Sequence, residues 1–124
     1  MMIEIKDLSV TFGSSTAVRN ASFSVAEGES FGLVGESGSG KSTILRTIMG
    51  LNWNWSGTIR VADLDPARTP RKTLARVVQM VFQDPYASLH PRHTIDRTLS
   101  EPLAIHGIPG TDQRIMQALT DVGL

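Results

Sequence analysis

The stretch GESGSGKST, at residues 35–43, lies between two apolar segments that differ in periodicity. The segment before it, SFGLV at residues 30–34, is a short apolar run bounded by turn residues, which favours a buried strand. From Lys41 onward apolar residues recur at helical spacing, and Gly50 stands where such a helix would end. The order of strand, glycine-rich loop and helix predicts an α/β fold.

The glycine-rich stretch has the composition of a phosphate-binding loop. The pattern G-x-x-x-x-G-K-[ST] is satisfied by Gly35, Gly40, Lys41 and Ser42. Inward-pointing backbone N–H groups and a helix N-terminus can solvate the charges of a nucleotide triphosphate. A flexible glycine-serine linker is the alternative, but linkers do not place a lysine and a hydroxyl at a helix start.

Each residue type in the loop suits a separate part of the ligand. We expect Lys41 to reach the β and γ phosphates, the Ser42 hydroxyl to ligate Mg²⁺, and Thr43 to donate to the α phosphate. The nucleotide contacts predicted for this stretch comprise Gly35, Glu36, Ser37, Gly38, Ser39, Gly40, Lys41, Ser42 and Thr43.

Composition narrows the possible partners. The 124 residues fit one domain, and 12 Lys and Arg balance 12 Asp and Glu, so no overall field favours nucleic acid. Cysteine is absent, which excludes disulfides and thiolate chemistry and is compatible with a reducing cytoplasm. No run approaches the roughly 18 apolar residues of a membrane helix, and we expect a soluble protein.

Further elements surround the loop. We expect an opening strand at residues 3–10 with an irregularity near Lys6 and Asp7, and other short strands at residues 23–25 and 58–61. VVQMVF, at residues 77–82, is apolar enough for a buried parallel strand.

The last thirty residues have helical periodicity. Ile95, Leu99 and Leu103 recur at spacing four before Gly107, with Pro102 predicting a kink or two short helices. A final amphipathic helix begins at Thr111 or Asp112 and stops at Gly123.

Four stretches of the chain are similar to one known family. They are RNASFSVAEGES at residues 19–30, GLVGESGSGKST at 32–43, VVQMVFQDPYASLHPR at 77–92 and TIDRTLSEPLAIHG at 94–107. Together they resemble the ATP-binding subunits of ABC transporters, in particular the oligopeptide and dipeptide (peptide/nickel) importer group. The third stretch, which looks like the Q-loop of that group, is the most specific.

The resemblance implies a P-loop NTPase fold with an N-terminal antiparallel β layer, a partial parallel core and the start of a helical subdomain. Residues 1–92 would belong to the ATPase core and residues 93–124 to the helical subdomain. It further implies Mg²⁺ and ATP as ligands, and hydrolysis coupled to import of peptides or similar solutes. The implied partners are transmembrane permease subunits and a second ATP-binding domain, on the cytoplasmic face of the membrane.

Individual residues take roles from the resemblance. Gln83 would contact Mg²⁺ or the attacking water and act with Lys41 in catalysis, and Phe12 would stack on adenine, although it could equally pack under the hairpin. His90 replaces the usual asparagine of the group, and with His93 it makes a poor metal site because a third ligand is missing.

The hydrolytic machinery of the family needs more than these residues. The sequence contains no LSGGQ-like signature, no Walker B strand and no switch histidine. We therefore expect an N-terminal half-domain that binds nucleotide without efficient hydrolysis alone and is marginally stable. A small soluble P-loop kinase using Asp84 as its magnesium ligand, or an inert fragment, are the alternatives.

Overall fold

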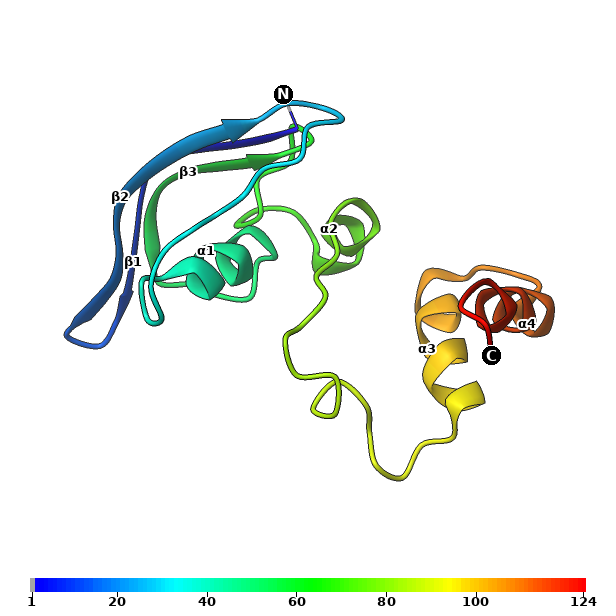
Figure 1. The fold of residues 1–124 in the computed structure, drawn as a ribbon. Helices are drawn as coiled ribbons and strands as arrows, with labels where there is room; N and C mark the ends of the chain where they lie inside the picture. The colour runs from blue at the N-terminus through cyan, green and yellow to red at the C-terminus, as the bar shows by residue number, and fades with distance from the viewer. Residues whose placement is uncertain (1) are drawn as a thin grey trace. The chain divides into compact units, whose positions relative to one another are not determined.

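The computed structural model describes residues 2–124, and the chain divides after Met80 into two compact units. The first unit contains a three-stranded antiparallel sheet in the order β2-β1-β3, with α1 against one face (Figure 1). Its elements are β1 (Ile3–Phe12), β2 (Ser15–Val25), α1 (Lys41–Ile48), β3 (Trp55–Val61) and α2 (Arg71–Val77). The predicted antiparallel layer at the N-terminus is therefore confirmed.

The core of the first unit lies between α1 and the sheet. Ile44 and Ile48, one helical turn apart, face the sheet and are each at most 6% exposed. Burying one such side chain contributes about 1.5–3 kcal/mol. The other buried members of this core are Ile5, Leu8, Val10, Val18, Ile59 and Val61.

The irregularity expected near Lys6 and Asp7 is a β-bulge. Pairing of β1 shifts register against both neighbours here, and Asp7 has φ 52°. The N–H of Asp7 donates instead to Ser22 Oγ at 2.8 Å. The extra residue changes the alternation, so Ile5 and Leu8 both face the core.

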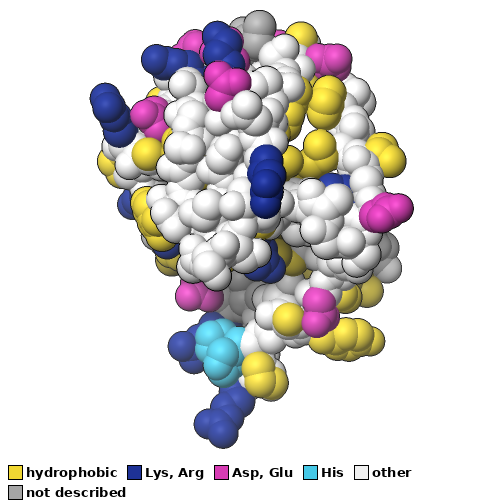
Figure 2. All heavy atoms as spheres, turned by 90° about the vertical axis from the view of Figure 1, so that its left-hand side faces the viewer, with side chains coloured by type: hydrophobic (Ala, Val, Ile, Leu, Met, Phe, Trp, Pro, Cys, Tyr) yellow, Lys and Arg dark blue, Asp and Glu magenta, His cyan; other side chains and the backbone are white. Residues whose placement is uncertain are grey.

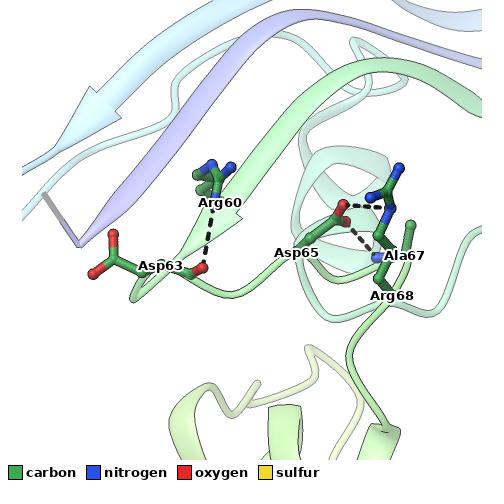
Figure 3. A network of polar contacts seen from close by, with 5 residues as sticks. All are labelled: Arg60, Asp63, Asp65, Ala67 and Arg68. Carbon is green, nitrogen blue, oxygen red and sulfur yellow. Dashed lines mark hydrogen bonds and ion pairs between the residues drawn. The ribbon is translucent and has the colours of Figure 1, made fainter.

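A tight turn and a polar network follow β3. Ala62 and Asp63 both have positive φ, and the Arg60 guanidinium donates to the Asp63 carbonyl at 3.3 Å. The Asp65 carboxylate accepts from the Ala67 N–H at 2.9 Å and lies 3.6 Å from Arg68 Nε (Figure 3). These contacts order the loop, whose proline and aspartate residues favour turns.

The second unit, Val81–Leu124, contains α3 (Ile95–His106) and α4 (Thr111–Asp121). The Thr94 hydroxyl caps α3 by accepting from the Arg97 N–H at 3.2 Å, and Gly107 ends it with φ 65°. Both predicted helices are confirmed. Pro102 lies inside a single helix, α3, so the chain does not divide there into two short helices.

Two expected strands, at residues 30–34 and 77–82, are not formed. The first has no strand assignment, and in the second α2 continues to Val77 before an irregular segment. Val34 is 93% exposed and Val81 is 97% exposed, so burial of these side chains does not favour a strand in either segment. A parallel strand needs a neighbour to bond its backbone groups, and neither segment pairs with a strand among residues 2–124.

Exposed apolar side chains accompany these unpaired segments, and Figure 2 shows hydrophobic groups at the surface of the molecule. We expect the isolated chain to melt broadly, to bind the dye ANS and to aggregate as it is heated, because such surface favours association. Differential scanning calorimetry with light scattering checks this. A sharp, reversible, monomeric transition would contradict it.

Candidate nucleotide site

The glycine-rich loop passes closely beside β2. Gly40 has φ 91°, and a Cβ added there would lie 2.5 Å from the Ala17 carbonyl oxygen and 3.0 Å from Val18 Cγ2. Gly38 also has positive φ, at 80°. Only glycine satisfies both the backbone conformation and the space at position 40, so β2 holds the start of α1 in place.

The Lys41 ammonium lies within the curve of the loop. Its Nζ donates to the carbonyl of Gly35 at 2.6 Å, to that of Glu36 at 2.5 Å, and to Ser39 Oγ at 3.1 Å. The Ser39 N–H in turn donates to the Glu36 carbonyl at 3.2 Å. All three donors of the ammonium group are therefore directed at the loop.

The N-terminus of α1 is available to an anion. Gly40 is its N-cap, and no side chain accepts from the first turn. The first N–H groups of a helix have no intrahelical partner, and the helix dipole adds partial positive charge there. The Ser42 side chain is exposed at this end and supplies a hydroxyl oxygen of the kind that Mg²⁺ accepts. The donor set and the glycine-only cradle fit a phosphate group with its magnesium ion.

Phe12 ends β1 and is 51% exposed. Phe12 pairs with Ser15 across the hairpin turn. Ser15 is two residues from Ala17, whose carbonyl oxygen would lie 2.5 Å from a Cβ added at Gly40. The structure therefore brings the Phe12 end of the hairpin and the glycine-rich loop to the same part of the first unit (Figure 1).

Gln83 and Asp84 are the two polar residues at the start of the second unit that the sequence singled out. Gln83 is exposed, and because it and Lys41 belong to different units its role beside Lys41 stays a prediction. Asp84 Oδ1 accepts from the N–H groups of Tyr86, at 2.9 Å, and Ala87, at 3.2 Å. The Asp84 carboxylate therefore stabilises its own turn. This local role accounts for its position without the magnesium ion that the kinase alternative assigns to it.

His90 and His93 stack with ring centroids 4.1 Å apart, and His90 Nδ1 accepts from the Arg92 N–H at 3.2 Å. Burial lowers the pKa of His93, and the Arg97 guanidinium lowers it further. Within residues 2–124, no group of three or more His, Asp or Glu side chains is placed to hold a metal ion.

Sequence reasoning did not single out Asn52, which contacts the helix that follows the loop. Its side-chain amide donates to the Thr43 carbonyl at 3.2 Å and to Thr47 Oγ1 at 3.0 Å. No pattern signals such a contact, because the partners are nine and five positions away and meet only after α1 has formed.

Comparison with known proteins identifies the family. The sequence model described as ABC transporter matches residues 18–124. The chain belongs to the ABC transporter family. An ABC relative, the oligopeptide transport ATP-binding protein OppF of Streptococcus pyogenes serotype M1, is 42% identical over 135 residues, covering 99% of this chain and 44% of OppF.

Two further ABC proteins agree. The glutathione import ATP-binding protein GsiA of Escherichia coli K12 is 45% identical over 116 residues, covering 87% of this chain and 18% of GsiA. A solved ATP-binding subunit of an ABC transporter superposes with a TM-score of 0.80 at 26% identity, covering 97% of this chain and 50% of that one. The resemblance and the P-loop fold class are confirmed. The chain spans less than half the length of these curated ABC relatives.

The helices themselves carry no membrane signal. Among residues 2–124, none is both long and apolar enough to cross a bilayer.

Proposed function

We propose that this chain binds Mg²⁺-ATP at residues 35–43 as part of an ABC importer for peptides or similar solutes. One observation carries the proposal: the Lys41 ammonium and the uncapped start of α1 lie on a loop that Gly40 anchors to β2. Positive charge and free N–H groups at one place suit a triphosphate.

Different loop residues contact different phosphates of the triphosphate. Lys41 exchanges the carbonyls of Gly35 and Glu36 for the β and γ phosphates, since an ammonium bonds a charged oxygen more strongly than a neutral one. Ser42 ligates the magnesium ion, and Thr43 donates to the α phosphate. Backbone N–H groups of the loop complete the cradle.

Two residues outside the loop contribute to the proposed site. Phe12, half exposed at the end of β1, stacks on the adenine ring. Gln83 offers an amide donor and acceptor to the magnesium ion or the attacking water, a role supported by its place in the Q-loop stretch.

The complete protein hydrolyses ATP and couples hydrolysis to solute import. The names of the relatives OppF and GsiA, which describe oligopeptide transport and glutathione import, support this proposal. Its partners are transmembrane permease subunits and a second ATP-binding domain, and it lies against the cytoplasmic face of the membrane. Residues 1–92 belong to the core and residues 93–124 to the helical subdomain. This chain alone binds ATP and hydrolyses it poorly.

Calorimetric titration of the chain with ATP in the presence of Mg²⁺ tests the proposal. We expect one ATP per chain and phosphate release close to the buffer rate. Absence of saturable binding up to millimolar ATP would overturn the proposal. Phosphoryl transfer from ATP to a small acceptor by the monomer would also overturn it, because the kinase alternative predicts that activity.

A further inference from the structure

Three residues between α1 and β3, the sequence NWN at 52–54, contact the two elements that carry the proposed nucleotide site, which are α1 and the end of β1. Asn52 holds the α1 side. Its amide bridges the Thr43 carbonyl and Thr47 Oγ1, and the Thr47 hydroxyl itself donates to the Thr43 carbonyl at 2.7 Å. Thr47 is fully buried, so this polar group is shielded from water.

Asn54 holds the opposite side, at the end of β1. Its backbone carbonyl accepts from the Thr11 N–H at 3.1 Å, and its side-chain amide donates to the Thr11 carbonyl at 3.2 Å. Regular pairing of β1 with β3 ends at Val10 and Trp55. The Asn54 side chain therefore supplies the donor that would otherwise come from a further strand residue, directly before Phe12.

Trp53 fixes the middle of the segment from outside. Trp53 is 62% exposed, and the Arg71 guanidinium carbon lies 4.8 Å from the centroid of its ring. The segment 52–54 is thus attached to α1, to β1 and to the first residue of α2.

We propose that Asn52 and Asn54 are positioning residues that set the spacing between the phosphate-binding turn of α1 and the aromatic end of β1. We call residues 52–54 the NWN bracket. The inference rests on the proposed function, because it assigns the bracket to the same ATP site. Asn52 acts on the phosphates through Thr43, and Asn54 acts on adenine through Thr11 and Phe12.

The effect of Asn52 passes along hydrogen-bonded peptides. The peptide group between Thr43 and Ile44 accepts from Asn52 and donates through the Ile44 N–H to the Gly40 carbonyl at 2.9 Å. That carbonyl shares its peptide group with the Lys41 N–H at the helix start. Bonds in such a chain polarise and align one another, so Asn52 strengthens a donor aimed at the phosphates.

Two ligands separate these roles: ATP, which carries both phosphate and adenine, and tripolyphosphate, which lacks the base. Each lost hydrogen bond removes about 0.5–1.5 kcal/mol, which is roughly a two- to tenfold effect. We therefore expect Asn52→Ala to weaken both ligands about three- to tenfold. Asn54→Ala should weaken ATP by a similar factor and leave tripolyphosphate unchanged, as should Phe12→Ala.

Thr58→Ala provides the matched control, since Thr58 is exposed on β3 and outside the bracket, and it should change neither affinity. Thermal midpoints of all variants are measured in parallel. If Asn52→Ala does not fold, Thr47→Val is the second variant. It removes the hydroxyl that accepts from Asn52 and donates to the Thr43 carbonyl, leaves the direct Asn52–Thr43 bond, and should weaken both ligands equally.

The possible outcomes are distinct. Unchanged affinities in the two asparagine variants would overturn the proposed role of the NWN bracket. The same conclusion would follow if both variants lost affinity equally for both ligands and the losses tracked the decrease in their thermal midpoints. Failure of the unmodified chain to bind ATP at all would overturn the proposed function instead. ATP binding that depends on Lys41 but not on Asn52 or Asn54 would leave that function standing and remove this inference alone.

Discussion

Lys41→Ala is expected to weaken ATP binding at least about tenfold, because a hydrogen bond to a charged group contributes about 1.5–3 kcal/mol. The ammonium already lies on the loop, 2.6 Å from the Gly35 carbonyl, so little reorganisation precedes its transfer to a phosphate. Isothermal titration with Mg²⁺-ATP measures the change in affinity.

Lys72→Ala is the matched control for charge, since Lys72 is exposed on α2 outside the loop. It removes one positive charge from the same unit and should leave ATP affinity unchanged. The thermal midpoint of Lys41→Ala separates loop damage from ligand loss, because Ser39 Oγ and two carbonyls lose their donor. An unaltered affinity of Lys41→Ala for ATP would contradict the assignment of the phosphate site.

Gly57→Ala is expected to destabilise the first unit by about 3 kcal/mol or more, since strain and a backbone clash add together. Gly57 has φ 104°, and a Cβ would lie 2.6 Å from the carbonyl oxygens of both Lys6 and Asp7. These are backbone atoms of the β-bulge and cannot rotate away. Urea unfolding followed by tryptophan fluorescence measures this loss, since Trp55 lies in β3 and Trp53 lies two residues before it.

Gly13→Ala isolates the conformational part of that effect. Gly13 also has positive φ, at 58°, but a Cβ there has no neighbour within 4 Å. We expect a loss of about 1–2 kcal/mol, the cost of a left-handed residue with a side chain. Equal losses in Gly13→Ala and Gly57→Ala would show that the bulge does not confine position 57.

Elements with a local signal were predictable from sequence. The helix after the glycine-rich loop begins at Lys41 and is followed by Gly50 with φ 68°, as the spacing indicated. Gly107 likewise ends α3. Glycine, proline and helical periodicity act through neighbouring residues, so their effects do not need the rest of the fold.

Two segments show where local reasoning fails. VVQMVF has the composition of a buried strand, yet it is irregular and Val81 is almost fully exposed. Strand formation depends on a hydrogen-bonding neighbour, which composition cannot supply. The short helix α2, which ends at Val77, was missed for the related reason that its single buried residue, Leu74, leaves almost no periodic pattern.

The sequence by itself determined that a loop with a lysine and a hydroxyl begins a helix, since residue type and spacing at positions 35–43 are sufficient for that conclusion. Only the tertiary structure decided what holds this loop. Gly40 lies against the Ala17 carbonyl, and Asn52 and Asn54 contact Thr43 and Thr11 across nine and forty-three positions. Such contacts have no local pattern, because hydrogen bonds between distant residues arise only when packing brings their atoms together.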